Sequence, residues 1–471
     1  MAACCAKSGA ARLIVKLAAV ALLLFLAAFE ASQGAAAADA RGHAALEARK
    51  AQLFQEMLAN PANLDVTFAY ADVSAQLGDY EAAVSALERM LLFNPNLPRV
   101  DVELGALYFR MGSYAVAESY FDKALAQHPP PDVRERIAEY LARIKSALSR
   151  HHVAGYFMFG TQYQSDANVA PGNSTVLGSF FGLSVPFSLP KQFVKAPDNN
   201  FFINGSVIYD YDLETQNRDA LEVTGTGFMN HYFIFDRFDL DYGEVTAGPR
   251  LNFPYLPGVS GASFKPYMIL NEVGLGENQY FWTYGGGLEY DEIVWHDLAL
   301  RTVVEAREKH FANAPDRPLS TGLSGHDVIV SLSAVKPITA NSALSAQFDF
   351  LNQDTALPFY SNNTYGVSGS YHIRYPTPRA ILPNFLETTL YLGRSWALYA
   401  APDPCCSTSG TFLFSPSDRF DRRWRFGITQ SLIISPRIAL VLQVERDIIS
   451  SNLSLYGYTS DSVLFGPQIR F

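Results

Sequence analysis

The sequence has few charged residues and no second long apolar run, and each shortage excludes a class of protein. Charged residues make up 17% of the 471 residues and hydrophobic residues 49%, which is too apolar for a disordered chain. After residue 38 no run of about 18 apolar residues occurs, so no membrane-spanning helix is predicted beyond that point. The net charge of −10 lacks the basic excess of nucleic-acid-binding proteins. We therefore expect no nucleic-acid partner.

The sequence also has few cysteines. The four cysteines form two adjacent pairs, Cys4 with Cys5 and Cys405 with Cys406, and neither pair has the CxxC spacing of a zinc site. Adjacent cysteines form a disulfide only with backbone strain. We therefore expect no metal site and no cofactor. Cys405 and Cys406 are predicted to lie in a loop, with their redox state left open.

Residues 1–38 have the three parts of a secretory signal peptide. Lys7, Arg12 and Lys16 supply positive charge, residues 17–29 form an apolar run, and residues 36–38 are small alanines suited to cleavage. The alternative is an uncleaved membrane anchor. The sequence therefore predicts an exported protein, and any later membrane insertion would have to use strands.

An internal repeat of 34 residues follows, which is the length of a tetratricopeptide repeat (TPR). Small residues are expected where the two helices of a repeat meet, tyrosines at the turn between them, and prolines after the second helix. The repeat positions are Ala71, Gly78, Tyr80, Ala83 and Pro95, which recur as Gly105, Gly112, Tyr114, Ala117 and Pro129. The sequence predicts an α-helical TPR solenoid over residues 44–150, with additional helices at 44–59 and 132–149. Its concave face would bind extended peptides or partner helices, or the solenoid would be a spacer.

From residue 151 to residue 471 the hydrophobic period changes to two. Segments of ten to sixteen residues, apolar on one face and polar on the other, are separated by polar, glycine- or proline-bearing turns. A soluble sandwich also alternates, but here a dozen apolar faces end in aromatic residues, as in the girdles of a transmembrane barrel. Fourteen segments are predicted to be barrel strands: 153–163, 201–213, 221–235, 239–252, 264–274, 279–294, 297–311, 325–336, 341–352, 363–376, 384–399, 418–434, 438–450 and 461–471.

Turn lengths support the barrel prediction. Short turns at 336–341 and 435–437 alternate with long loops at 312–324, 353–362 and 451–460, as periplasmic turns alternate with extracellular loops. If both the solenoid and the end of the last strand are periplasmic, the number of strands must be even. A fifteenth candidate at 176–185 is therefore assigned to a long first loop. Sixteen strands is the alternative.

The polar faces of these strands carry charges of both signs. Such side chains would line the lumen and are expected to pair across strands rather than form a binding site. The charges concerned are Arg301, Glu305, Arg307, Arg423, Arg425 and Glu445.

The last strand, DSVLFGPQIRF, ends in an aromatic residue. Such a strand is similar to the signal that directs bacterial barrels to their assembly machinery, and we assign that role to Phe465, Ile469 and Phe471. The alternative for this stretch alone is the last strand of a soluble sheet. Pro467 cannot donate a hydrogen bond to a ladder. A weak seam between 153–163 and the last strand is therefore predicted at Pro467.

Two short motifs and the domain order resemble those of the surface lipoprotein assembly modulators, or Slam proteins. The motifs are residues 163–171 (YQSDANVAP), after the first strand, and residues 451–458 (SNLSLYGY), before the last. The resemblance covers about residues 45–471. It implies a fourteen-stranded barrel with a periplasmic solenoid that delivers particular lipoproteins or small secreted proteins across the outer membrane of a Gram-negative bacterium.

Three classes of function remain open at this point. The first is a translocon whose partners are a client lipoprotein or secreted protein, periplasmic chaperones, the barrel assembly machinery and membrane lipid. The second is an exopolysaccharide export porin, against which the mixed lumen charge counts. The third is an outer-membrane enzyme, but His310, His326 and His372 lie on different segments without a nucleophile motif. We expect no catalytic activity.

Overall fold

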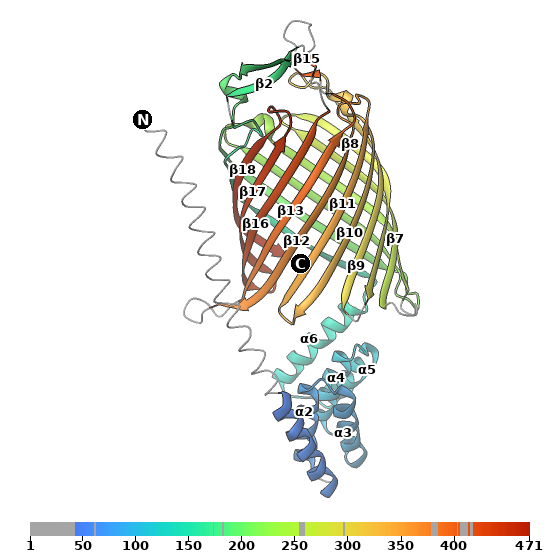
Figure 1. Cartoon of the computed structure of the whole chain (residues 1–471). Coiled ribbons are helices and arrows are strands. Elements are labelled where there is room, and N and C mark those ends of the chain that lie inside the picture. The colour runs from blue at the N-terminus through green and yellow to red at the C-terminus, as the bar shows by residue number, and fades with distance from the viewer. Residues whose placement is uncertain are drawn as a thin grey trace. The chain divides into compact units, whose positions relative to one another are not determined.

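The computed structural model describes two compact units that meet in sequence at Ser149 and Arg150. The first is helical and the second is built of strands (Figure 1). The predicted signal segment, residues 1–38, lies outside the described residues, as does Cys406. Within the described ranges, no helix combines the length and apolar composition needed to cross a membrane. These ranges are 43–60, 63–172, 174–180, 183–253, 260–294, 297–377, 385–402, 404–405, 413–414 and 418–471.

The helical unit is the predicted solenoid. α2 and α4 begin 34 residues apart, as do α3 and α5, so the sequence repeat is a structural repeat. The predictions of a TPR-like solenoid and of a helix on each side of it are confirmed. Residues 43–59 are helical, and α2 (Leu64–Gln76), α3 (Tyr80–Phe93), α4 (Pro98–Arg110), α5 (Tyr114–Ala126) and α6 (Pro131–Ala147) follow.

The turn between the helices of each repeat is made by glycine. Gly78 has φ +81° and Gly112 has φ +73°, a left-handed conformation that glycine adopts without a steric penalty. In the first repeat, Asp79 caps α3 by accepting a hydrogen bond from the Ala82 N–H at 3.1 Å. Lys50 donates a second one at 2.5 Å and so lowers the pKa of Asp79 below its usual value.

The remaining repeat residues lie at the contacts between helices. Tyr80 and Tyr114 are the first residues of α3 and α5, and Pro95 and Pro129 follow the ends of these helices. Ala71, Ala83 and Ala117 are buried. Gly105 of α4 lies against the Phe121 ring of α5, and a Cβ atom at Gly105 would be 2.7 Å from that ring.

Replacing Gly105 by valine is therefore expected to destabilise the solenoid. Overpacking of a filled core costs about 1–3 kcal/mol. Thermal unfolding of the full-length protein in detergent, followed by the helical circular dichroism signal, measures the loss. Ala115→Val is the matched control. Ala115 of α5 is exposed, whereas Gly105 of α4 is buried, so the added methyl groups meet no packed neighbour. Equal unfolding midpoints for the two variants would show that Gly105 is not closely packed.

The second unit is a closed antiparallel barrel of fourteen strands, as predicted (Figure 1). Barrel strands that follow one another along the chain are paired, and the first barrel strand pairs with the last. The barrel strands are β1 (His151–Gln164), β4 (Asp198–Asp212), β5 (Ala220–Tyr232), β6 (Leu240–Phe253), β7 (Ser260–Leu275), β8 (Asn278–Val294), β9 (Leu298–Phe311), β10 (Gly325–Thr339), β11 (Ser342–Thr355), β12 (Asn362–Pro376), β13 (Phe385–Tyr399), β16 (Phe420–Ser435), β17 (Ile438–Ser451) and β18 (Tyr458–Arg470).

The fifteenth candidate strand lies outside the barrel. Residues 176–185 fall within a separate hairpin of β2 (Thr175–Phe180) and β3 (Leu183–Ser188). The segment belongs to the long connection between β1 and β4, as expected, although it forms strands of its own. β14 (Pro404–Cys405) and β15 (Leu413–Phe414) form another small sheet, which places Cys405 in the connection between β13 and β16.

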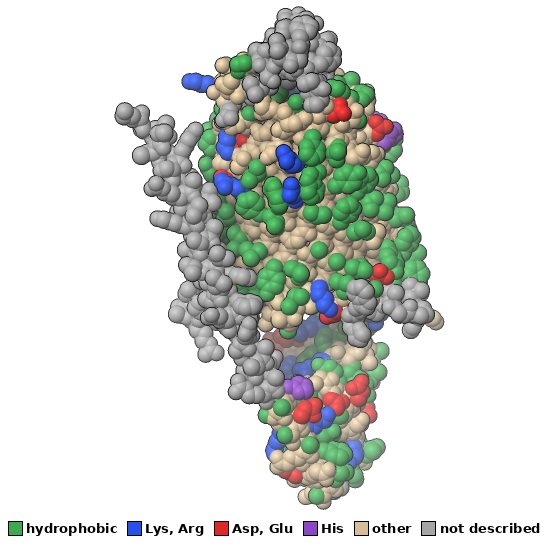
Figure 2. All heavy atoms as spheres, in the orientation of Figure 1, with side chains coloured by type: hydrophobic (Ala, Val, Ile, Leu, Met, Phe, Trp, Pro, Cys, Tyr) green, Lys and Arg blue, Asp and Glu red, His purple; other side chains and the backbone are tan. Residues whose placement is uncertain are grey.

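The two faces of the wall differ in polarity. Leu332, Phe348, Val367 and Trp424 lie in one row around the barrel and are all exposed on its outer face. Figure 2 shows this face as largely hydrophobic. Because the backbone of a closed barrel is hydrogen-bonded within the wall, such a wall can face lipid without unsatisfied groups. The fold is that of a transmembrane barrel.

Candidate functional site

The lumen side of β5 to β9 is held together by a network of ion pairs around Arg250. Three nitrogen atoms of this guanidinium lie 2.8 Å from Glu222, 2.8 Å from Glu289 and 2.9 Å from Asp291. Lys265, which is 4% exposed, also donates to Glu222. Arg301 binds Asp291 from the next strand at 2.6 Å. Five strands are thus connected by charges that satisfy one another.

Removing one charge from this network is expected to destabilise the barrel strongly. Glu222→Gln leaves the buried Lys265 ammonium without a carboxylate, and breaking a buried pair in this way costs about 3–5 kcal/mol. The double variant Glu222→Gln/Lys265→Met removes both charges and should recover much of that loss. The urea midpoint of the barrel in lipid vesicles measures the effect. Lys336→Gln is the control, because its pair with Asp297 is exposed.

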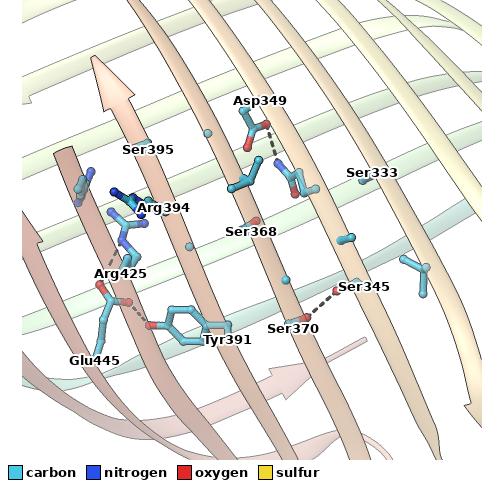
Figure 3. A pocket seen from close by; sticks show the side chains of 18 residues that line it. Ser333, Ser345, Asp349, Ser368, Ser370, Tyr391, Arg394, Ser395, Arg425 and Glu445 are labelled. Atoms are coloured by element: carbon cyan, nitrogen blue, oxygen red, sulfur yellow. Dashed lines mark hydrogen bonds and ion pairs between the residues drawn. The ribbon is translucent and has the colours of Figure 1, made fainter. Parts of the chain in front are cut away.

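A second group of ion pairs lies where β13, β16 and β17 meet. Arg423 binds Asp447 at 2.7 Å, and Arg425 lies 3.5 Å from Glu445. Tyr391 donates its hydroxyl hydrogen to Glu445 (Figure 3). Pairing across strands is therefore confirmed for Arg301, Arg423 and Arg425.

Two of the predicted lumen charges, Glu305 and Arg307, pair with each other within one strand. Arg307 binds Glu305 on its own strand at 2.8 Å, and it also reaches Glu244 of β6 at 2.8 Å. The expectation of a cross-strand partner therefore holds for Arg307 only through Glu244, a residue that the sequence analysis did not single out.

A cavity of about 740 Å³ lies between this charged group and β10 to β13. Its lining from β10 to β13 is rich in serine and glycine, so few side chains fill the space. Ser345 and Ser370 bond each other at 2.6 Å, and Asp349 accepts from Gln347 at 2.8 Å (Figure 3). Such a lining can form hydrogen bonds with an extended polar chain.

An apolar cluster lies in the lumen beside β1 and β18. Met158, Phe202 and Val441 are buried together and pack against Phe228 and Leu464. All five belong to the alternate positions that point inward on their strands. The inner surface thus combines a charged sector, a hydroxyl-rich sector and an apolar sector, and it does not have one sign of charge.

The seam between β1 and β18 has the fewest rungs of any neighbouring pair in the barrel. It has seven register pairs, whereas the other neighbouring pairs have eleven to fifteen. The ladder passes from Met158↔Gln468 directly to Thr161↔Phe465 and so skips two rungs. Backbone bonds of Gly155 with Phe471 and of Ser165 with Asp461 extend the seam at its two ends.

Pro467 lies in the skipped part of the seam, opposite Phe159. Gly155 and Phe471 exchange both backbone bonds, and hydrogen-bonded pairs alternate along an antiparallel ladder, so Phe159 and Pro467 would form such a pair. Proline has no N–H to donate. The next pair is Gly160 and Gly466, where an added Cβ would lie 2.1 Å from the Phe465 oxygen and 1.9 Å from the Phe159 oxygen, respectively. The strands therefore touch at this point, and the seam is closed despite its missing bonds.

The proposed assembly-signal residues lie on the outer face of β18. Phe465, Ile469 and Phe471 are 52%, 40% and 55% exposed. The N–H of Phe471 donates to the Gly155 oxygen at 3.1 Å, and its own oxygen accepts from the Gly155 N–H at 3.0 Å. Phe471 is thus part of the seam and also presents its ring on the wall.

A second skip in the barrel ladder was not predicted. Between β6 and β7 the register passes from Ala247↔Met268 to Leu251↔Phe264, so three rungs are missing. Pro249 and Pro266 face each other in this gap, and neither can donate a hydrogen bond. The two prolines were visible in the sequence, but only the register reveals that they are opposite each other.

The solenoid has a groove of its own, with a volume of about 400 Å³, between α2 and α4. Arg99 lies over the Phe68 ring with its Cζ atom 4.7 Å from the ring centre. The groove has a small apolar floor and a rim with both signs of charge, which suits a short peptide of mixed character. Its lining includes Asp65, Phe68, Asp72, Arg99, Glu103 and Arg110.

Comparison with known protein families agrees with the repeat in the helical unit. Residues 71–142 match the tetratricopeptide repeat family. No curated protein matches the sequence. A thermophilic TPR protein of Thermus thermophilus, whose structure is known, is 30% identical over 22% of this chain and 53% of its own, with a TM-score of 0.21. This chain thus spans about half the length of that protein.

The barrel is similar to two outer-membrane proteins of known structure. One is from Acinetobacter baumannii (13% identity, 68% of this chain and 99% of that chain, TM-score 0.30). The other is the OpdK protein of Pseudomonas aeruginosa (8% identity, 68% and 99%, TM-score 0.28). At these TM-scores neither likeness adds to what the barrel wall itself shows.

Proposed function

We propose that this protein is a non-catalytic outer-membrane translocon. Its barrel delivers specific lipoproteins or small secreted proteins to the cell surface or exterior. Its solenoid lies in the periplasm and recruits the client or a chaperone that carries it. A TPR solenoid joined to a barrel of the outer-membrane type supports a role in transport, and the likeness to Slam proteins suggests this class of client.

The observation that carries the proposal is the seam. A barrel opens laterally where the fewest backbone bonds must break, and the β1–β18 pair has seven rungs and a skip at Pro467. Opening this edge would expose unpaired N–H and C=O groups to which an extended client strand could add. The apolar cluster of Met158, Phe202 and Val441 lies on the lumen side of the same edge and could receive apolar client side chains.

Strand parity and loop length support a periplasmic orientation of the solenoid. With fourteen strands, the start of β1 and the end of β18 lie at the same end of the barrel, as the register Tyr156↔Arg470 requires. Two of the three two-residue connections between described barrel strands, 340–341 and 436–437, belong to this end, whereas the third, 276–277, and the long connections 165–197 and 312–324 belong to the other. Short turns are typical of the periplasmic end. The groove at Arg99 and Phe68 would then meet clients before export.

Deletion of the gene tests the proposal. Surface lipoproteins can be measured by protease treatment of intact cells, and secreted proteins in the medium. We expect a small set of clients to be lost from the surface or medium and retained inside the cell. Re-expression of the intact chain should restore them. If every surface lipoprotein and secreted protein is unchanged, the proposal is wrong.

The second candidate is an exopolysaccharide export porin. The serine-rich lining at Ser345, Ser368 and Ser370 favours it, because hydroxyl groups can bond to a glycan. The mixed charges and the apolar sector count against it. Single-channel recording tests this second function: a polysaccharide pore should be open and of large conductance, and a small conductance would exclude it.

A further inference from the structure

Two arginines lie on the outer face of the barrel, within its apolar band. Arg394 of β13 and Arg422 of β16 occupy outward positions, in phase with Leu392, Leu398 and Phe426, which are 52%, 47% and 40% exposed. Figure 2, in which β12, β13 and β16 face the viewer, shows basic side chains set into the hydrophobic surface of this wall. The intervening residues Arg423 and Arg425 point the other way, into the lumen.

The two outward arginines alternate with two tryptophans in the register. Arg394 is opposite Trp424, and Trp396 is opposite Arg422, so the four side chains form a square on the wall. The Cζ atom of Arg394 lies 4.6 Å from the Trp424 ring centre and 4.8 Å from that of Trp396. Stacking between two indoles fixes the plane of the guanidinium and partly offsets its transfer from water.

Neither arginine has an anionic partner within the part of the chain that the structure describes. The lumen arginines Arg423 and Arg425 pair with Asp447 and Glu445, but no described carboxylate lies within ion-pair distance of Arg394 or Arg422. The Nε atom of Arg394 is buried and is not bonded by any described group. A charged group on a lipid-facing wall is costly unless it lies near the interface or binds an anion there.

The square lies toward the end of the barrel opposite to Arg470. Arg422 is the third residue of β16, which begins at that end, and Trp424 is the fifth. With the solenoid in the periplasm, this end faces the cell exterior. Tryptophan is enriched at the level of the lipid headgroups, and the planar guanidinium matches the oxygens of a phosphate group. The arginine and tryptophan side chains on this part of the wall are therefore suited to bind a phosphate group at the level of the outer leaflet.

We propose that Arg394, held between Trp396 and Trp424, and the neighbouring Arg422 bind the phosphate group of a lipid headgroup in the outer leaflet. Each guanidinium can donate two parallel hydrogen bonds to phosphate oxygens, and the indoles contact the first part of the lipid. The bound lipid would neutralise both arginines and join β13 to β16 on the outside of the wall. The site depends on the barrel spanning the membrane, and it is independent of which client is transported.

The test uses the full-length protein in vesicles of phosphatidylcholine, alone or mixed with bisphosphorylated lipid A. Native mass spectrometry measures the lipid that remains bound, and the urea midpoint measures stabilisation. Wild type should retain the bisphosphorylated lipid A at least about tenfold better than Arg394→Gln/Arg422→Gln, since charge-assisted hydrogen bonds are lost. Its midpoint should rise with lipid A, and the variant's should not. Lys336→Gln, an outward basic residue paired with Asp297, should behave as wild type.

Three further measurements test whether the phosphate group and the guanidinium groups are responsible for the binding. Equal retention of lipid A stripped of its phosphates would show binding by acyl chains only and overturn it. Equal stabilisation by inorganic phosphate in excess would identify a site for a free ion, which also overturns it. Arg394→Lys/Arg422→Lys keeps both charges without the planar guanidinium and should lose part of the retention. This variant provides the test if the glutamine variant does not fold, and full retention by it would exclude recognition by paired guanidinium hydrogen bonds.

Discussion

A disulfide across the β1–β18 seam is expected to stop client delivery. Gln162 and Leu464 are a register pair, and the positions of the Gly155 and Ser165 bonds make it a non-hydrogen-bonded pair. Such residues have Cα atoms about 4.5 Å apart, which a disulfide can span. Gln162→Cys/Leu464→Cys, in a chain with Cys405→Ser and Cys406→Ser, should therefore lock the seam.

Delivery of the clients found by gene deletion should be lost under oxidising conditions and should return when reductant is added. The control is Ser368→Cys/Gly393→Cys, a lumen-facing pair between β12 and β13. It is also a non-hydrogen-bonded pair, since Ala400 donates to Ser361 and Tyr399 to Arg419. A Cβ at Gly393 would lie 3.4 Å from that of Ser368. This second lock should leave delivery intact.

The pair of variants separates two routes through the protein. If both locks stop delivery, the barrel must deform as a whole. If neither does, the client passes through the lumen or elsewhere in the wall, and the seam is not the gate. The gap at Pro249 and Pro266 would then be the next place to lock, because its ladder also lacks rungs.

The sequence was sufficient to predict the architecture, because the 34-residue repeat of the helical unit and the two-residue alternation of the strands are both pronounced. The 34-residue offset identified α2 to α5, and alternation with turn signals identified the fourteen strands to within a few residues. Alternation does not reveal which residues oppose each other across strands. Pro467 was noticed because it lies on the last strand, but its opposition to Phe159, the glycine contact beside it and the facing Pro249 and Pro266 required the register.

The same limit hid how the outward arginines are arranged, although not the face on which they lie. Arg423 and Arg425 were assigned to the lumen because Trp424 and Phe426 alternate with them. Arg394 is in phase with Leu392 and Trp396, so alternation in 385–399 was enough to place it on the outer face. Its position between two indoles comes from pairing with β16, a strand more than twenty residues later in the sequence.

Removal of Phe471 is expected to lower the outer-membrane abundance of the protein to a small fraction of wild type. This residue has two separable roles. Its backbone forms the last rung of the seam with Gly155, and its exposed ring would be recognised by the barrel assembly machinery. Deletion removes both, whereas Phe471→Ala keeps the rung and removes only the ring. The amount in the outer-membrane fraction, and the mobility shift of folded barrel on heating, measure the outcome.

The two variants and one control distinguish these roles. If the ring is the signal, Phe471→Ala and the deletion should both be depleted. If the rung alone matters, only the deletion should be. Phe426→Ala removes another exposed ring of the outer face, on β16, and should insert normally, because its strand is not at the seam. Normal insertion of both Phe471 variants would refute both roles, because an unpaired Gly155 would then not impair closure of the barrel.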